Sequence, residues 1–105
     1  MLARTVTPPP RHPAIRRDLA LVAPEAVPVA GLGEVMARAG APLLESAALF
    51  DIYRGKQVQA GTRSLAWRLA FRAPDRTLTE AEADAALARI VAAAGTECGA
   101  TLRAI

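Results

Sequence analysis

The chain has 105 residues, of which 52% are apolar and 22% charged, and its formal net charge is +3. This composition indicates one folded domain rather than a disordered tail, and its mild basic bias favours anionic partners without proving one. Cys98 is the only cysteine, which excludes an intramolecular disulfide and a cysteine-based structural zinc site. A lone cysteine suits a reducing compartment, and no apolar run is long enough to span a bilayer, so we expect a cytoplasmic, non-membrane protein.

The chain begins with a proline-rich segment, MLARTVTPPPRHP. Its four prolines favour a stiff, extended backbone. We therefore predict a linker over residues 1–13 and a folded domain over residues 14–105. The only histidine, His12, lies in this linker, so the sequence gives no support for a Ser-His-Asp triad.

Alternation of apolar and polar residues predicts strands at about 17–23, 44–54 and 64–72. The third is the clearest, because its large apolar residues all share one face. These residues are Leu65, Trp67, Leu69 and Phe71. We expect them to pack in the core.

The second strand alternates in the same way. Phe50 and Ile52 are expected on its apolar face, whereas Leu49, Asp51 and Tyr53 are expected on the opposite face. This interpretation makes Phe50 a core residue.

Two helices separate the strands. The first is expected between Pro28, which suits a first helical turn, and Gly40. The second begins with a Thr-x-x-Glu capping box at Thr79 and Glu82, and it ends before Gly99. A short strand at about 100–104 closes the chain, with Leu102 directed inward.

The predicted order is β-α-β-β-α-β, which is typical of an α+β, ferredoxin-like sandwich. Its four-stranded antiparallel sheet carries both helices on one face, because both crossovers are right-handed. The other face is left open, and it receives Asp51, Tyr53, Ser64, Arg68 and Arg72.

An acid, an aromatic ring, a hydroxyl and arginines on one sheet face can bind an unstacked nucleic-acid base. They are a poor basis for catalysis. The sequence has no glycine-rich phosphate loop and no metal-ligand spacing. Asp18 and Asp51 are a possible carboxylate pair across the sheet, but nothing in the sequence predicts the pKa difference that acid–base chemistry needs. The domain by itself is not expected to be an enzyme.

Several segments closely resemble the ferredoxin-fold anticodon-binding domain, the C-terminal domain of bacterial phenylalanyl-tRNA synthetase beta subunits. They are residues 12–22 (HPAIRRDLALV), 49–56 (LFDIYRGK), 64–72 (SLAWRLAFR), 74–79 (PDRTLT) and 99–103 (GATLR). The segments follow one another in the family's order and cover nearly the whole chain.

The resemblance implies a domain that holds the anticodon stem-loop of phenylalanine tRNA. It also implies a parent enzyme of two alpha and two beta subunits that uses ATP and magnesium, with no cofactor in this domain and with the aminoacylation site on the alpha subunit. In the family, the tyrosine of the Phe-Asp-x-Tyr-Arg-Gly motif stacks on the first anticodon base, a guanine. The motif's aspartate and a serine on the next strand help to recognise it. These roles fall on Tyr53, Asp51 and Ser64.

Basic residues on and beside the same strands are expected to contact phosphates. They are Arg54, Lys56, Arg63, Arg68, Arg72 and Arg103. Two other functions remain open, because a fold does not choose a function. The open face can instead dock a protein, or the domain can bind a small regulatory molecule.

Overall fold

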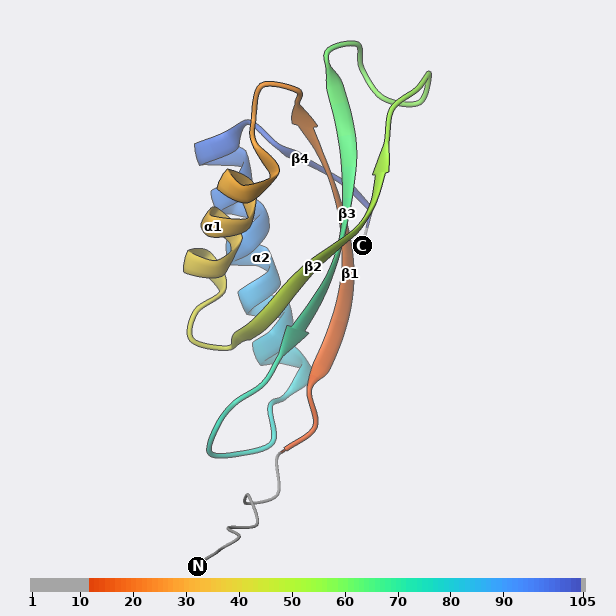
Figure 1. Cartoon of the computed structure of the whole chain (residues 1–105). Helices are drawn as coiled ribbons and strands as arrows, with labels where there is room; N and C mark the ends of the chain where they lie inside the picture. The colour runs from red at the N-terminus through yellow and green to blue at the C-terminus, as the bar shows by residue number, and fades with distance from the viewer. Residues whose placement is uncertain (1–11, 105) are drawn as a thin grey trace, which may run out of the picture.

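The computed structural model describes residues 12–104, so the predicted linker lies outside the described residues except for His12 and Pro13. Within this part of the chain, strands and helices follow the predicted order (Figure 1). They are β1 (Ile15–Pro24), α1 (Val29–Gly40), β2 (Leu44–Tyr53), β3 (Thr62–Phe71), α2 (Glu80–Cys98) and β4 (Thr101–Ala104).

The strands form one sheet in the order β2-β3-β1-β4, and every neighbouring pair is antiparallel. Both helices lie against the same face of this sheet, and its other face is left open (Figure 1). This arrangement confirms the predicted α+β, ferredoxin-like sandwich.

The core lies between the helices and the covered sheet face. The central strands β1 and β3 contribute alternate residues to it, in the pattern that the sequence predicted for β3. The largest fully buried side chains are Phe71, Leu19, Leu21, Leu32, Met36, Leu65, Leu69 and Ile90. Each contributes about 1.5–3 kcal/mol through burial of its apolar surface. Trp67 is also buried, as predicted.

Helix α2 is held at both ends by local hydrogen bonds. The Glu82 backbone N–H donates to Thr79 Oγ1 (3.1 Å), and the Thr79 N–H donates to Glu82 Oε1 (3.1 Å), which completes the predicted capping box. Gly99 ends the helix with a φ of 66°, a left-handed conformation that favours glycine. Within residues 12–104, neither helix is long and apolar enough to cross a membrane.

A β-bulge in β2 changes the predicted alternation. Leu49 lies opposite Trp67, but the next paired residue, Asp51, lies opposite Ala66. The extra residue, Phe50, lies on the open face, and its ring contacts the Arg68 guanidinium. The prediction that Phe50 packs in the core is wrong, because a bulge shifts the register that strict alternation assumes. Phe50 is 50% exposed.

Candidate nucleic-acid interface

The ring of Tyr53 lies at the end of β2, where the hairpin loop begins. It rests against Gly55, since a Cβ atom added to Gly55 would lie 2.5 Å from Tyr53 Oη and 2.8 Å from its Cζ. Any side chain at position 55 would therefore displace the ring. The glycine of the Phe-Asp-x-Tyr-Arg-Gly segment thus leaves the space that the tyrosine ring occupies.

A second contact on the Tyr53 ring comes from the opposite edge of the sheet. Arg103, on β4, places its guanidinium carbon 5.1 Å from the ring centroid. Its Nη2 also donates to Gln57 Oε1 in the hairpin loop (3.0 Å). A cation–π contact at an exposed site is worth about 0.5–1 kcal/mol, so the ring is oriented without being locked.

The Asp51 carboxylate stands on the open face, opposite Ala66, and it is exposed. It makes no hydrogen bond or ion pair with any other residue of the described chain, 12–104. Arg68, the nearest arginine on β3, pairs instead with Asp18 at 3.0 and 3.2 Å. That hydrogen bonding lowers the pKa of Asp18. Of these two carboxylates, Asp51 is therefore the one without a partner among residues 12–104, and the two aspartates do not form a pair.

Ser64 lies directly opposite Tyr53 on β3, so the structure brings these two predicted site residues together. However, Ser64 is only 3% exposed. A hydrogen bond from its hydroxyl to a base requires the side chains that cover it to move.

Three of the predicted phosphate contacts donate hydrogen bonds to carboxylates of the domain itself. Arg54 donates from Nε and Nη2 to Glu25, at 2.6 and 3.1 Å, and this lowers the pKa of Glu25. Arg68 is held by Asp18 as described above. The side chains of Arg54 and Arg68 are 60% and 54% exposed, so a phosphate that approaches them competes with the carboxylates that they already contact.

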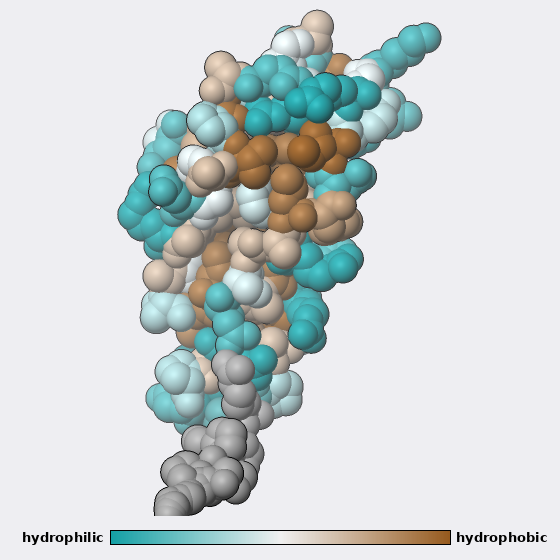
Figure 2. Space-filling model, in the orientation of Figure 1, coloured by the Kyte–Doolittle hydropathy of each residue, from teal (hydrophilic) through white to brown (hydrophobic). Residues whose placement is uncertain are grey.

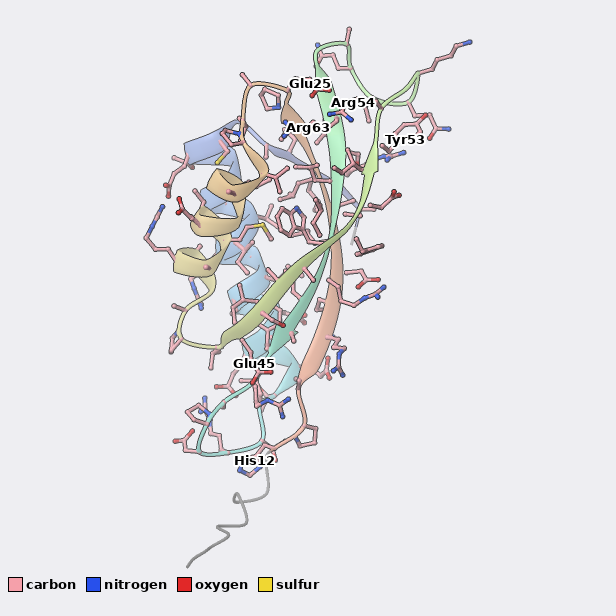
Figure 3. The ribbon with its side chains drawn as sticks, in the orientation of Figure 1. His12, Glu25, Glu45, Tyr53, Arg54 and Arg63 are labelled. Atoms are coloured by element: carbon pink, nitrogen blue, oxygen red, sulfur yellow. The ribbon has the colours of Figure 1, made fainter. Side chains whose placement is uncertain are left out.

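The third of these, Arg72, lies at the other end of the sheet. Its Nε donates to Glu45 Oε2 (2.9 Å), and its Nη1 donates to the His12 carbonyl. Figure 3 shows Glu45 and His12 at the lower end of the molecule and Tyr53 at the upper end. Arg72 therefore anchors the chain that enters β1 and is remote from the aromatic ring.

Arg63 has a structural position. Its side chain is 5% exposed, and its guanidinium donates to the carbonyls of Pro24 and Val27, the latter at 2.6 Å. It joins β3 to the connection between β1 and α1, near Glu25 and Arg54 (Figure 3). A side chain so enclosed is poorly placed for a phosphate contact, and we leave it out of the interface.

Among residues 12–104, three exposed cations have no side-chain partner. One of them, Arg89, lies on α2 and donates to the Ala39 carbonyl. The other two are Lys56 and Arg16. Lys56, which the sequence predicted, lies in the hairpin loop. Arg16, which it missed, lies on β1 opposite Ala70 and shares the open face with Asp18. The alternation of β1 was a sufficient signal for Arg16, because residues two apart on a strand share a face.

Phe50 was also missed as an open-face residue. Its signal is the adjacent pair Leu49–Phe50, since two large apolar residues in succession break an otherwise alternating strand. The surface seen in Figure 2 has hydrophilic side chains at both ends and an apolar cluster between them, in the upper half of the view. Within residues 12–104, the exposed large apolar side chains are Phe50, Ile52 and Leu102.

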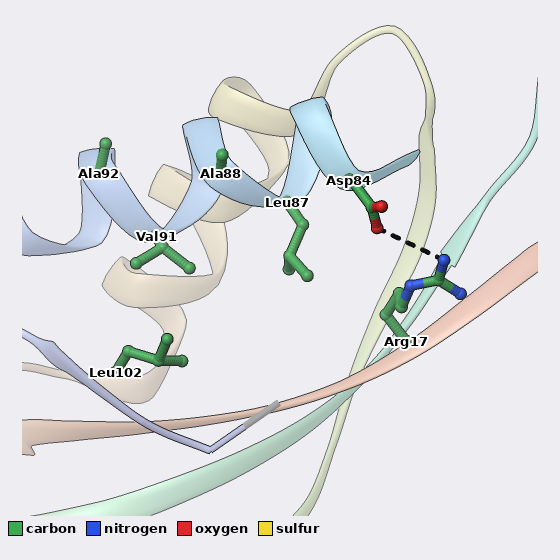
Figure 4. A pocket seen from close by; sticks show the side chains of 7 residues that line it. All are labelled: Arg17, Asp84, Leu87, Ala88, Val91, Ala92 and Leu102. Atoms are coloured by element: carbon green, nitrogen blue, oxygen red, sulfur yellow. Dashed lines mark hydrogen bonds and ion pairs between the residues drawn. The ribbon is translucent and has the colours of Figure 1, made fainter. Parts of the chain in front are cut away.

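A separate groove of about 490 Å³ lies between α2 and β4 (Figure 4). Its lining is aliphatic except for Arg17 and Asp84, which pair with each other at one end (3.4 Å). Leu102, predicted to point inward, is 44% exposed at this edge because β4 is the short outer strand. The groove lacks the convergent polar groups that orient a metabolite, which disfavours a small-molecule regulatory domain.

Residues 10–103 match the family model described as "Ferredoxin-fold anticodon binding domain". This chain belongs to that family. The anticodon-binding domain is 49% identical over 96 residues to the phenylalanine–tRNA ligase beta subunit of Moorella thermoacetica, a match that covers 91% of this chain and 12% of that protein. It is 50% identical over 96 residues to the beta subunit of Anaeromyxobacter dehalogenans, with the same shares covered. The corresponding protein of Nocardia farcinica is 46% identical over 91 residues, 87% of this chain and 11% of its own length. The domain thus spans about one eighth of the length of these relatives.

Proposed function

We propose that this domain binds the anticodon of phenylalanine tRNA and stacks the first anticodon base on Tyr53. The observation that carries the proposal is the pairing of an oriented aromatic ring with an unpaired carboxylate. The ring lies against Gly55, and Asp51 stands two residues before it on the same strand face. The family match and the beta-subunit relatives support the choice of RNA.

Stacking supplies affinity, and the carboxylate supplies the choice of base. A base stacked on an aromatic side chain gains roughly 1–3 kcal/mol, and every base offers such a face. Guanine also presents N1–H and N2–H on its Watson–Crick edge. Both can donate to a carboxylate such as Asp51, whereas adenine has an acceptor at N1. Loop bases are accessible to this kind of recognition because they are not paired.

The chemistry of aminoacylation belongs elsewhere in this proposal. The domain acts by binding and positioning, as part of a cytoplasmic phenylalanine–tRNA ligase beta chain that assembles with an alpha subunit. ATP and magnesium serve that parent enzyme. Among residues 12–104, no cluster of His, Cys, Asp and Glu side chains has the arrangement of a metal site.

The test is binding of the 105-residue chain to two anticodon stem-loops at low salt, one with guanine and one with adenine at the first anticodon position. We expect a preference for guanine. Tyr53→Ala should weaken binding to the guanine loop by roughly 5- to 150-fold, the loss of one stack. Asp51→Asn should reduce the preference for guanine more than it reduces binding to adenine.

The control is Ile52→Ala, which truncates a side chain of the same strand on the opposite sheet face, one that is 43% exposed and so more exposed than the half-buried Tyr53. It should bind as the unaltered chain does. Equal binding of both loops, or a folded Tyr53→Ala variant of unchanged affinity, would reject the base-reading role. If the domain binds a protein partner and RNA does not displace that partner, a protein-docking role would be favoured instead.

A further inference from the structure

The open face contains a hollow of about 210 Å³ that the Tyr53 platform does not use. It is lined by Asp18, Leu19, Ala20, Phe50, Ala66 and Ala104. Pockets for drug-sized ligands usually measure about 300–1,000 Å³, so this hollow suits a smaller group such as one planar ring system.

The hollow exists because small residues lie side by side across three strands. Ala66 on β3 is paired with Ala20 on β1, and Ala20 is paired with Ala104 on β4. Each presents only a methyl group to the open face. Larger side chains at these positions would fill the hollow, as they fill the covered face of the same strands.

One wall of the hollow is Phe50, the residue that the β2 bulge turns to the open face. The Arg68 guanidinium packs on this ring at 4.5 Å from its centroid, and Asp18 holds Arg68 through two hydrogen bonds. Arg68 does not line the hollow. The ring is therefore supported by a fixed partner while part of its surface remains turned to the hollow.

Two carboxylates flank this hollow. Asp18 belongs to its lining, and Asp51 lies opposite Ala66, in line with the alanine row. Each carboxylate oxygen accepts more than one hydrogen bond, so Asp18 can still receive an amino group while it holds Arg68. Phe50 precedes Tyr53 by three residues, at most about 10 Å along a strand that rises 3.3 Å per residue.

We propose that this hollow takes a second unstacked base of the same RNA loop, next to the base on Tyr53. The base lies over the alanine row with one side against Phe50, and an exocyclic amino group donates to Asp18. This proposal rests on the proposed function, since it extends the same RNA contact by one nucleotide. Aromatic side chains in series on a sheet are a common way to hold successive unstacked bases.

The test combines two variants of the hollow with a series of stem-loops that each lack one loop base. Phe50→Ala removes the wall, and Ala66→Leu fills the floor. Each should weaken binding of the intact loop by roughly 5- to 150-fold. One of the abasic loops lacks the base that would enter the hollow, and it is a different loop from the one that lacks the first anticodon base. With that loop, the hollow variants should bind as tightly as the unaltered chain does.

Two controls match these variants. Ile52→Ala truncates an apolar residue of comparable exposure (43% against 50% for Phe50) on the other sheet face, and Ala48→Leu enlarges an exposed alanine outside the hollow. Both should bind within about twofold of the unaltered chain. If Ala66→Leu does not fold, Phe50→Ala with the abasic series decides alone.

The outcomes separate the two proposals. If Phe50→Ala and Ala66→Leu bind normally while Tyr53→Ala binds weakly, the hollow is not a base site and the anticodon role stands. An equal loss with every abasic loop also overturns the second site, because the effect is then not that of one base. If the unaltered chain binds no stem-loop, both proposals fail.

Discussion

The two faces of the sheet are built from the same central strands and differ in what their side chains contact. On the covered face of β3, Leu65, Leu69 and Phe71 are fully buried against the helices. On the open face of the same strand, Ala66 forms a floor and Arg68 stands half exposed. Large residues fill one face and small ones leave space on the other.

This difference separates stability from binding. Side chains of the covered face have protein neighbours on all sides, so their removal leaves a cavity. Side chains of the open face contact few neighbours, and two of them, Asp51 and Arg16, have no side-chain partner among residues 12–104. We therefore expect variants of the two faces to affect different measurements.

The largest effect on stability is expected from the covered face. Leu69→Ala should lower the free energy of unfolding by about 2–5 kcal/mol, because Leu69 is fully buried. Phe50→Ala removes a larger side chain from the open face and should cost about 1 kcal/mol, mainly its contact with Arg68. Urea unfolding of both variants measures the difference. Similar losses would show that the open face also carries the fold.

A buried and an exposed arginine give a second, smaller difference in stability. Arg63→Ala should lower stability by about 2–3 kcal/mol, since two backbone carbonyls lose a charged donor in a buried position. Arg68→Ala should lower stability far less than Arg63→Ala does, because its pair with Asp18 is exposed to solvent. Both values come from the same urea titration. If Arg63→Ala leaves the free energy of unfolding unchanged, Arg63 becomes a candidate RNA contact again.

The smallest of these effects concerns the cap of α2. Thr79→Ala should lower stability by about 1 kcal/mol, because it removes the side chain that accepts from the Glu82 N–H. Thr96→Ala, at an exposed position near the end of the same helix, is the control and should be close to neutral. Neither variant lies on the open face, so stem-loop affinity should stay unchanged in both. If either variant binds the stem-loop more weakly, a change on the covered side of the sheet alters binding at the open face.

Much of this fold was predictable because its signals are local. The alternation in β3 gave its core face, and the capping box gave the start of α2. The bulge at Phe50 was not predicted, since the register of β2 depends on its pairing with β3. Which arginines pair with carboxylates also depends on residues that are distant in the sequence. Glu45 and Arg72, for example, are 27 residues apart, and no sequence pattern predicts their contact.

The candidate site was predictable to a similar degree. Tyr53 and Asp51 share the open face as the sequence indicated, and the resemblance supplied their roles. The support beneath the ring was not foreseen, because contacts of Gly55 and Arg103 with it arise only once the loop and β4 are in place. The burial of Ser64 likewise depends on what neighbouring strands place over it.

The internal pairing of arginines has a consequence for how the domain responds to salt. A single-stranded site releases about 0.7 counterion per phosphate neutralised, and six unpaired cations would give a slope of about −4 in log affinity against log salt. On or beside the open face, the exposed cations of residues 12–104 without a carboxylate partner are Arg16, Lys56 and Arg103. A fourth, Arg89, lies on α2. With the three on or beside the open face, the slope falls to about −2. More of the domain's affinity for RNA would then come from contacts with bases than from counterion release. Its discrimination between bases would therefore persist as ionic strength rises.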